Sequence, residues 1–206
     1  IQRGRGNRIL VVTQKSMLTQ FQKEFWNRFT IPLVRLDSVG LARVRSRIPP
    51  NHNPFYYYDR SIISVDTLKG DLEYRTYLEK AQWDIILIDE CHNVADRGTG
   101  SQRARLAKLL ASRSDTLIML SATPHDGRAR SFASLVNMLD PTSISDPDEY
   151  RAEDFRDKGL VIRRFKKDIQ AQVGSAFKDR LVRCERHAAT DPSAAQYFFS
   201  GDRFVA

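Results

Sequence analysis

Two carboxylates follow a short apolar run near the middle of the chain. Asp89 and Glu90 come directly after Ile85–Ile88 and are followed by Cys91 and His92. A magnesium nucleotide needs hard oxygen ligands, and hydrolysis of its terminal phosphate needs a group that orients or deprotonates a water. Adjacent carboxylates can supply both functions. An isolated Asp-Glu pair is more often a helix cap with an acidic first turn, so neighbouring residues must decide between these interpretations.

A second polar group follows another apolar run. The sequence Ser-Ala-Thr-Pro-His occupies positions 121–125, directly after Leu117–Leu120. In an open parallel sheet, ligands bind beyond the carboxyl ends of the strands. If both apolar runs are strands, Ser121 and Thr123 lie where they can meet the carboxylates and relay a change in phosphate state. The two groups together favour a catalytic site over a helix cap.

Short buried strands are the elements that must hold these residues. Three nearly continuous apolar runs, 9–12, 85–88 and 117–120, have the length of strands buried on both faces, and 61–65 is a fourth candidate. Helices are predicted between them from apolar residues at helical spacing. These residues are Met17, Leu18, Phe21, Phe25 and Phe29 in one helix, Leu68, Leu72 and Leu78 in another, and Leu106, Leu109 and Leu110 in a helix capped by Ser101. The alternation predicts a doubly wound α/β fold.

Composition narrows the class of protein without identifying it. The 206 residues carry a formal charge of +8, which favours an anionic partner but also occurs in many soluble domains. No apolar run approaches the roughly 18 residues of a membrane helix, so we expect no membrane partner. Cys91 and Cys184 are too few for a disulfide framework, and a cytoplasmic location is expected. A zinc site built from Asp89, Cys91, His92 and His125 does not match the usual ligand spacings.

Two other segments are irregular or polar. Residues 48–59 contain three prolines and end in Tyr56-Tyr57-Tyr58. Three consecutive tyrosines cannot all face one way, so packing is a better explanation than a platform for stacking bases. From Asp146 onward, charged helical segments are predicted up to Asp168, followed by a strand over 180–186.

Together these motifs resemble those of superfamily-2 helicases and translocases. Asp-Glu-Cys-His resembles the DExH box, motif II, and Ser121-Ala122-Thr123 resembles motif III. Further segments are similar to the Swi/Snf-type branch: residues 15–25 to motif Ia, with Gln14 in place of a proline and Phe21 in place of a tryptophan, and residues 62–68 to motif Ib. Residues 163–169 resemble the segment that closes the first lobe. The Asp-Glu-Cys-His form is similar to bacterial RapA-like members, and a phage-defence helicase is a looser expectation.

The resemblance implies a RecA-like parallel sheet with helices on both faces and roles for named residues. Asp89 would hold Mg²⁺, through water, and Glu90 would activate the attacking water. His92, Ser121 and Thr123 would couple the phosphate state of ATP to movement. Three residues would contact the phosphates of the tracked strand of double-stranded DNA: Lys15, Ser16 and Thr67. A solvated helix start for Lys15 and a cap for Thr67 remain alternatives, and the basic residues of 163–167 suit a solvated or interlobe face.

A motor of this kind also needs a phosphate-binding loop, GxxxxGK[ST], which is not found in these 206 residues. We expect that loop one βα unit before Ile1, and a second RecA-like lobe after Ala206. Residues 1–145 would be the first lobe without its phosphate-binding loop, and 146–206 the closing helices and connector. The fragment alone would be inactive. Two alternatives stay open: a nucleic-acid-binding or scaffold relic without turnover, and a metal-dependent hydrolase built on Asp89, Glu90 and His92.

Overall fold

The computed structural model describes residues 6–69, 72–98, 100–124, 128–151, 153–156 and 158–162. The predicted strand over 180–186 and the segment 163–169 lie outside the described residues. So does His125, which belonged to the zinc alternative. Within the described residues, no helix is long and apolar enough to cross a membrane.

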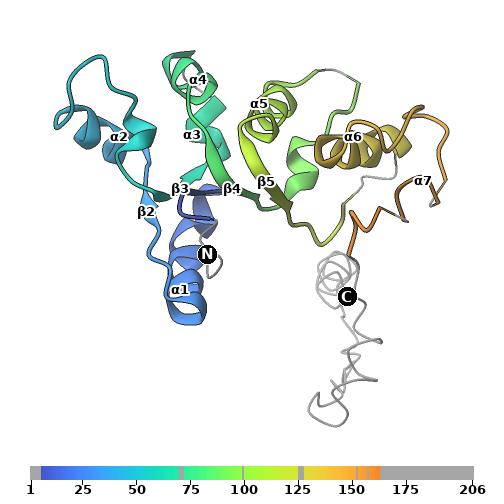
Figure 1. The fold of residues 1–206 in the computed structure, drawn as a ribbon, viewed down its shortest axis with the longest axis horizontal. Helices are drawn as coiled ribbons and strands as arrows, with labels where there is room; N and C mark the ends of the chain where they lie inside the picture. The colour runs from blue at the N-terminus through green and yellow to red at the C-terminus, as the bar shows by residue number, and fades with distance from the viewer. Residues whose placement is uncertain are drawn as a thin grey trace, which may run out of the picture. The chain divides into compact units, whose positions relative to one another are not determined.

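A five-stranded parallel sheet forms the centre of the fold (Figure 1). Its order is β2-β3-β1-β4-β5, with β1 at Ile9–Thr13, β3 at Arg60–Ser64, β4 at Trp83–Ile88 and β5 at Ser114–Met119. The four predicted strands are therefore confirmed. The fifth, β2 at Val34–Arg35, is only two residues long and pairs with β3, and the sequence contains no apolar run that predicts it. β1 is central, and all five of its residues are buried because both sheet faces are covered there.

Burial of β5 differs from the prediction. The run 117–120 was expected to be covered on both faces, but Ile118 is 39% exposed and Leu120 is 41% exposed. Among the described strands, β5 lies at the edge of the sheet and pairs only with β4. An apolar run alone does not distinguish a central strand from an edge strand, and this accounts for the error.

Helices cover both faces of the sheet, as predicted (Figure 1). α1, at Leu18–Phe29, packs its Leu18 against Ile9 and Val11 on one face. The opposite face carries Leu10 and Val12 and is covered by α2 at Ser38–Arg45, α3 at Val65–Lys69, α4 at Leu72–Glu79 and α5 at Gln102–Ala111. Alternate residues of β1 thus serve two separate cores.

Among the predicted helices, one agrees with the structure at its cap and another is divided in two. Ser101 caps α5 through its hydroxyl, which accepts a hydrogen bond of 3.2 Å from Ala104 N, as expected. The leucines at 68, 72 and 78 belong to two helices, α3 and α4, rather than to one. Neither α2 nor α6, at Ala129–Leu139, was predicted. α6 builds a third apolar cluster in which Phe132 packs against Tyr150 and Phe155.

The tyrosine segment is packed only in part: Tyr58 packs against the main core, whereas Tyr56 is 48% exposed and Tyr57 is 42% exposed. The segment begins at the end of a short 3-10 helix, Pro54–Tyr56, in which Phe55 is fully buried. The Tyr56 hydroxyl donates to Lys80 O at 3.1 Å, and the Arg8 guanidinium lies 4.3 Å from the centre of the Tyr56 ring. Residues 1–162 form one compact unit. The proposed boundary after residue 145 stays a prediction.

Candidate functional site

Asp89 lies at the carboxyl end of β4 and is held by the neighbouring strand. Its amide donates to Val12 O at 2.9 Å, which continues the parallel ladder between β4 and β1 by one residue. Its Oδ2 accepts a hydrogen bond of 2.8 Å from the hydroxyl of Thr13, a residue with no exposed surface. A buried donor fixes the orientation of the carboxylate and leaves Oδ1 for other partners. The position of Asp89 is as predicted, and Thr13 was missed.

Glu90 adopts a different backbone conformation from its neighbours. Its φ is 48° and its ψ is 48°, in the left-handed region, and it caps the 3-10 helix η3 at Cys91–Val94. A side chain in this region costs roughly 1–2 kcal/mol relative to glycine, because Cβ approaches the following carbonyl oxygen. The sharp turn places the Glu90 carboxylate beside His92, with 3.1 Å between Glu90 Oε2 and His92 Nδ1. Adjacent carboxylates therefore have different partners.

His92 joins the two predicted motifs. Its Nδ1 lies 3.1 Å from Glu90 Oε2 and 3.0 Å from Ser121 Oγ, so one ring nitrogen contacts a residue of each motif. An ionised carboxylate can only accept hydrogen bonds, so the contact with Glu90 is favourable when Nδ1 carries the proton. That proton is then shared between Glu90 and Ser121. The sequence predicted the three residues but not that His92 stands between the other two.

Ser121 and Thr123 form a tight turn after β5. Ser121 Oγ accepts a hydrogen bond of 3.1 Å from Thr123 N. The backbone of Leu120, directly before Ser121, is hydrogen-bonded to the end of β4 and to the DExH segment. Leu120 N donates to Ile88 O, and Cys91 N donates to Leu120 O, each at 2.9 Å. Ser121 is thus linked to the Glu90 carboxylate through His92, while Thr123 is exposed.

A groove of about 680 Å³ brings some of the predicted nucleic-acid contacts to the carboxylates. Lys15 and Ser16, from the short helix after β1, line it together with Asp89 and Glu90. Arg103 from α5 also lines it and pairs with Asp66 at 2.9 Å. Sequence reasoning missed Arg103, because only the fold brings the first turn of α5 to this edge.

Thr67 has a local partner instead. Its hydroxyl lies 2.8 Å from Ser64 Oγ, and that oxygen also accepts from Thr67 N at 3.1 Å. Ser64, which directly precedes α3, is therefore the capping residue, and Thr67 lies in the first turn with its hydroxyl bonded to that cap. Contact between Thr67 and a phosphate stays a prediction.

Zinc does not fit the described residues. No group of three His, Cys, Asp or Glu side chains that could hold a metal occurs in the part of the chain that the structure describes. Cys91 is buried, and burial raises the pKa of its thiol to about 11, so it is protonated at neutral pH and poor as a zinc ligand. Mg²⁺ differs because it usually binds one or two carboxylates, with waters and substrate phosphates completing its shell. Asp89 fits that requirement.

Comparison with known proteins decides the family. Residues 1–183 match the SNF2-related domain. This chain belongs to the SNF2-related family. It is 29% identical over 154 residues to the RNA polymerase-associated protein RapA of Sodalis glossinidius, which is 74% of this chain and 16% of that protein. RapA of Yersinia enterocolitica is 27% identical over 148 residues, covering 71% of the chain and 15% of the relative.

Solved structures support the SNF2-related fold. The Sulfolobus solfataricus SWI2/SNF2 ATPase core in complex with dsDNA matches 84% of this chain with a TM-score of 0.53 at 20% identity. The Pyrococcus furiosus Hef helicase domain matches 66% with a TM-score of 0.50 at 17% identity. The chain covers 31% and 28% of those two chains and about one sixth of the RapA proteins. It corresponds to the N-terminal RecA-like lobe of SNF2-related proteins, as predicted.

Proposed function

We propose that this chain is the water-activating part of a motor lobe that hydrolyses ATP with Mg²⁺ and moves along double-stranded DNA. The observation that carries the proposal is the contact of His92 Nδ1 with both Glu90 and Ser121. A catalytic carboxylate and the turn that follows the next strand share one proton there. A proton shared in this way can transmit a change at the phosphates of ATP from Glu90 to the Ser-Ala-Thr turn.

Asp89 would hold Mg²⁺ through an intervening water, because this ion usually keeps several of its waters, while Thr13 keeps the carboxylate oriented. When bound there, Mg²⁺ would neutralise the charge that develops on the oxygens of the transferred phosphoryl group of ATP. Glu90 takes the proton of the attacking water. As Glu90 becomes protonated, it attracts the Nδ1 proton of His92 less, and His92 then donates more strongly to Ser121. The turn at 121–123 responds to the state of Glu90 by this exchange.

Nucleic-acid contact is proposed for the groove beside these residues. Lys15 offers an ammonium group and Ser16 a hydroxyl, which suit contacts with a phosphate backbone that do not depend on base sequence. Similarity to a SWI2/SNF2 core that was solved with dsDNA favours double-stranded DNA as the track. Translocation without strand separation is the proposed outcome, and a phage-defence role stays a prediction.

Other parts of the protein complete the site in this proposal. The phosphate-binding loop and the second RecA-like lobe come from outside these 206 residues, and the chain alone is inactive. The exposed side chains of Ile118 on β5 and of Leu120 just after it support a neighbouring βα unit on that side of the sheet.

Substitution of Glu90 by Gln in the intact protein tests the proposal. Glu90→Gln should lower DNA-stimulated ATP turnover by about 100-fold or more, since the amide cannot accept the water's proton. Binding of ATP, measured with a fluorescent analogue, should persist. Retained turnover would contradict the role of Glu90. Nucleic-acid binding that is unaffected by ATP in the unmodified protein would favour the relic alternative, and hydrolysis of a substrate without ATP would favour the metal-dependent hydrolase.

A further inference from the structure

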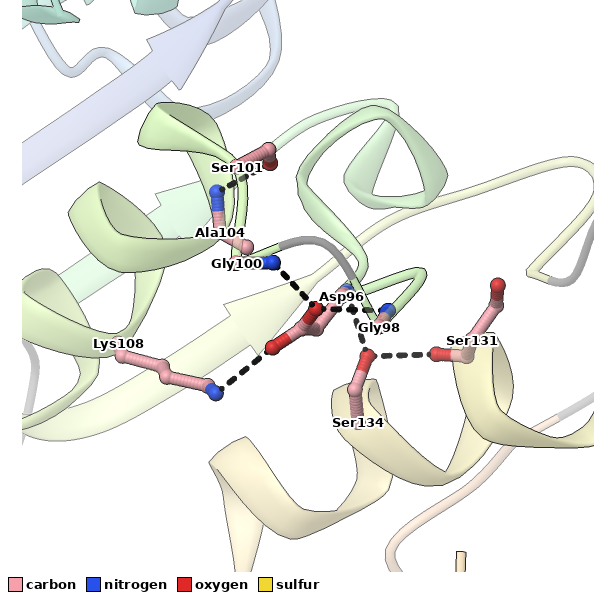
Figure 2. A network of polar contacts seen from close by, with 8 residues as sticks. All are labelled: Asp96, Gly98, Gly100, Ser101, Ala104, Lys108, Ser131 and Ser134. Atoms are coloured by element: carbon pink, nitrogen blue, oxygen red, sulfur yellow. Dashed lines mark hydrogen bonds and ion pairs between the residues drawn. The ribbon is translucent and has the colours of Figure 1, made fainter. Parts of the chain in front are cut away.

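Asp96 is the centre of a polar network (Figure 2). It follows η3 and is therefore only a few residues after Glu90 in the chain. Its Oδ1 accepts from Gly98 N at 3.0 Å and from Gly100 N at 3.3 Å, and its Oδ2 accepts from Lys108 Nζ of α5 at 3.1 Å. One carboxylate thus ties the end of the DExH segment to the loop before α5 and to the last turn of that helix.

The turn around this carboxylate requires glycine. Gly98 has φ of 89° and Gly100 has φ of 56°, both in the region that other residues rarely adopt. These conformations turn the two amides toward Asp96 Oδ1. Hydrogen bonding to Lys108 is the main reason that the pKa of Asp96 is lowered, and the two glycine amides contribute. The carboxylate is ionised and locally satisfied at neutral pH.

The backbone of Asp96 reaches a third element. Asp96 N donates to Ser134 Oγ of α6 at 2.9 Å, and Ser134 Oγ donates in turn to Ser131 O at 2.7 Å (Figure 2). α6 is the helix that follows the Ser-Ala-Thr turn. A groove of about 750 Å³ opens beside this bond and is lined by Asp96, Lys108 and Ser134 among others. The polar network therefore bridges segments that border open space there.

The DExH segment and the segment from the end of β5 to α6 are consequently joined at several successive points. The DExH segment contacts the strand end of β5 through Cys91 N and Leu120 O, then the Ser-Ala-Thr turn through His92 and Ser121. Asp96 and Ser134 make the third connection, beyond both motifs. α6 also packs on the main core through Leu135, and the bond from Asp96 N to Ser134 Oγ adds a directional polar contact between this helix and the DExH segment.

We propose that Ser134 and Asp96 are positioning residues that make α6 follow the DExH segment when the nucleotide state changes. The inference rests on the proposed function, because it takes the DExH segment as the part that senses nucleotide. Movement at η3 passes through the amide of Asp96 to the hydroxyl of Ser134, while Lys108 and the two glycine amides keep the turn rigid enough to transmit it.

Ser134→Ala in the intact protein is the test, since it removes one hydroxyl from the bridge and leaves the DExH segment unchanged. Ser134→Thr retains the hydroxyl, which in a helix can still bond the carbonyl three residues earlier. Asp148→Asn is the matched control: Asp148 accepts from Arg130 of α6 at 3.0 Å and is not part of the bridge. Amide hydrogen exchange is measured with and without a non-hydrolysable ATP analogue, on peptides covering 91–95 and 129–139.

In the unmodified protein, ATP analogue should slow exchange in both peptides. In Ser134→Ala, slowing should persist at 91–95 and be lost at 129–139, and the distance moved per ATP should fall about fivefold or more. Ser134→Thr and Asp148→Asn should behave like the unmodified protein. Unchanged slowing at 129–139 in Ser134→Ala overturns the inference, as does an equal loss in Asp148→Asn. If the unmodified protein shows no slowing at 91–95, the proposed function itself fails.

Discussion

The hydroxyl of Thr13 donates a hydrogen bond of 2.8 Å to Oδ2 of Asp89, from a position with no exposed surface at the end of the neighbouring strand. The β1/β4 register, with Val12 opposite Ile88, brings the next residue of each strand together. The carboxylate expected to hold Mg²⁺ is thereby oriented by a group that water cannot replace.

Removal of the Thr13 hydroxyl should weaken the binding of Mg²⁺. Thr13→Val keeps the shape of the side chain but leaves Asp89 Oδ2 without its donor. In the intact protein, the Mg²⁺ concentration for half-maximal ATPase should rise about 10-fold or more, as for other residues that orient metal ligands. Mn²⁺ binding measured by electron paramagnetic resonance should weaken in parallel. Thr13→Ser should restore both, and an unchanged Mg²⁺ requirement in Thr13→Val would contradict the role of Thr13.

Because Glu90 has a left-handed backbone conformation, glycine at this position should give a more stable protein than alanine, which is the reverse of the usual order. Glu90→Ala and Glu90→Gly both remove the carboxylate, but only glycine relieves the contact of Cβ with the backbone at φ of 48°. The glycine variant should therefore be more stable than the alanine variant by about 1 kcal/mol in urea denaturation. A more stable alanine variant would show that Glu90 carries no such strain.

Substitutions in the Ser-Ala-Thr turn should have unequal effects on coupling. Ser121→Ala removes the oxygen that contacts His92 Nδ1 and accepts from Thr123 N. Thr123→Ala keeps its backbone amide, so that hydrogen bond remains. Both should reduce the distance moved per ATP more than ATP turnover, and Ser121→Ala should do so by about fivefold or more. Measurement of both rates on the same DNA checks this, and parallel losses of the two would argue against a relay.

Asp84 should give the chain a stability that acid removes. Its Oδ2 accepts from the amides of Gly6, Asn7 and Arg8, and the bond from Arg8 is the main reason that its pKa is lowered. A carboxylate whose pKa is lower in the folded state stabilises the fold above its unfolded pKa, and this contribution is lost as pH falls through the folded pKa. Asp84→Asn should therefore cost stability near neutral pH and less at about pH 3. Urea denaturation at both values tests it, with an equal difference as the contrary result.

Sequence patterns predicted the centre of this fold because buried parallel strands read as continuous apolar runs. The same reasoning located the carboxylates and the Ser-Ala-Thr turn, since both follow such runs. It did not predict β2, which depends on pairing with β3, or α2, which contains Gly40 and has weak apolar periodicity. α6 did carry a signal, because Phe132, Leu135, Val136 and Leu139 recur at helical spacing.

Partners of the site residues were harder to predict than the residues themselves. Thr13 meets Asp89 through strand register, and Arg103 reaches Asp66 through the packing of α5 beside α3. Neither relation has a signature in local spacing. The bridge from Asp96 to Ser134 joins residues 38 positions apart and depends on the placement of α6.

The open edge at β5 bears on how this polypeptide can be handled in the laboratory. Among the described strands, β5 pairs on one side only, so its other side and the exposed side chains of Ile118 and the following Leu120 can contact another chain in solution. Purified by itself, the polypeptide should therefore self-associate through this strand and precipitate as its concentration rises. A lysine at position 118 would oppose such aggregation and give a soluble sample for spectroscopy.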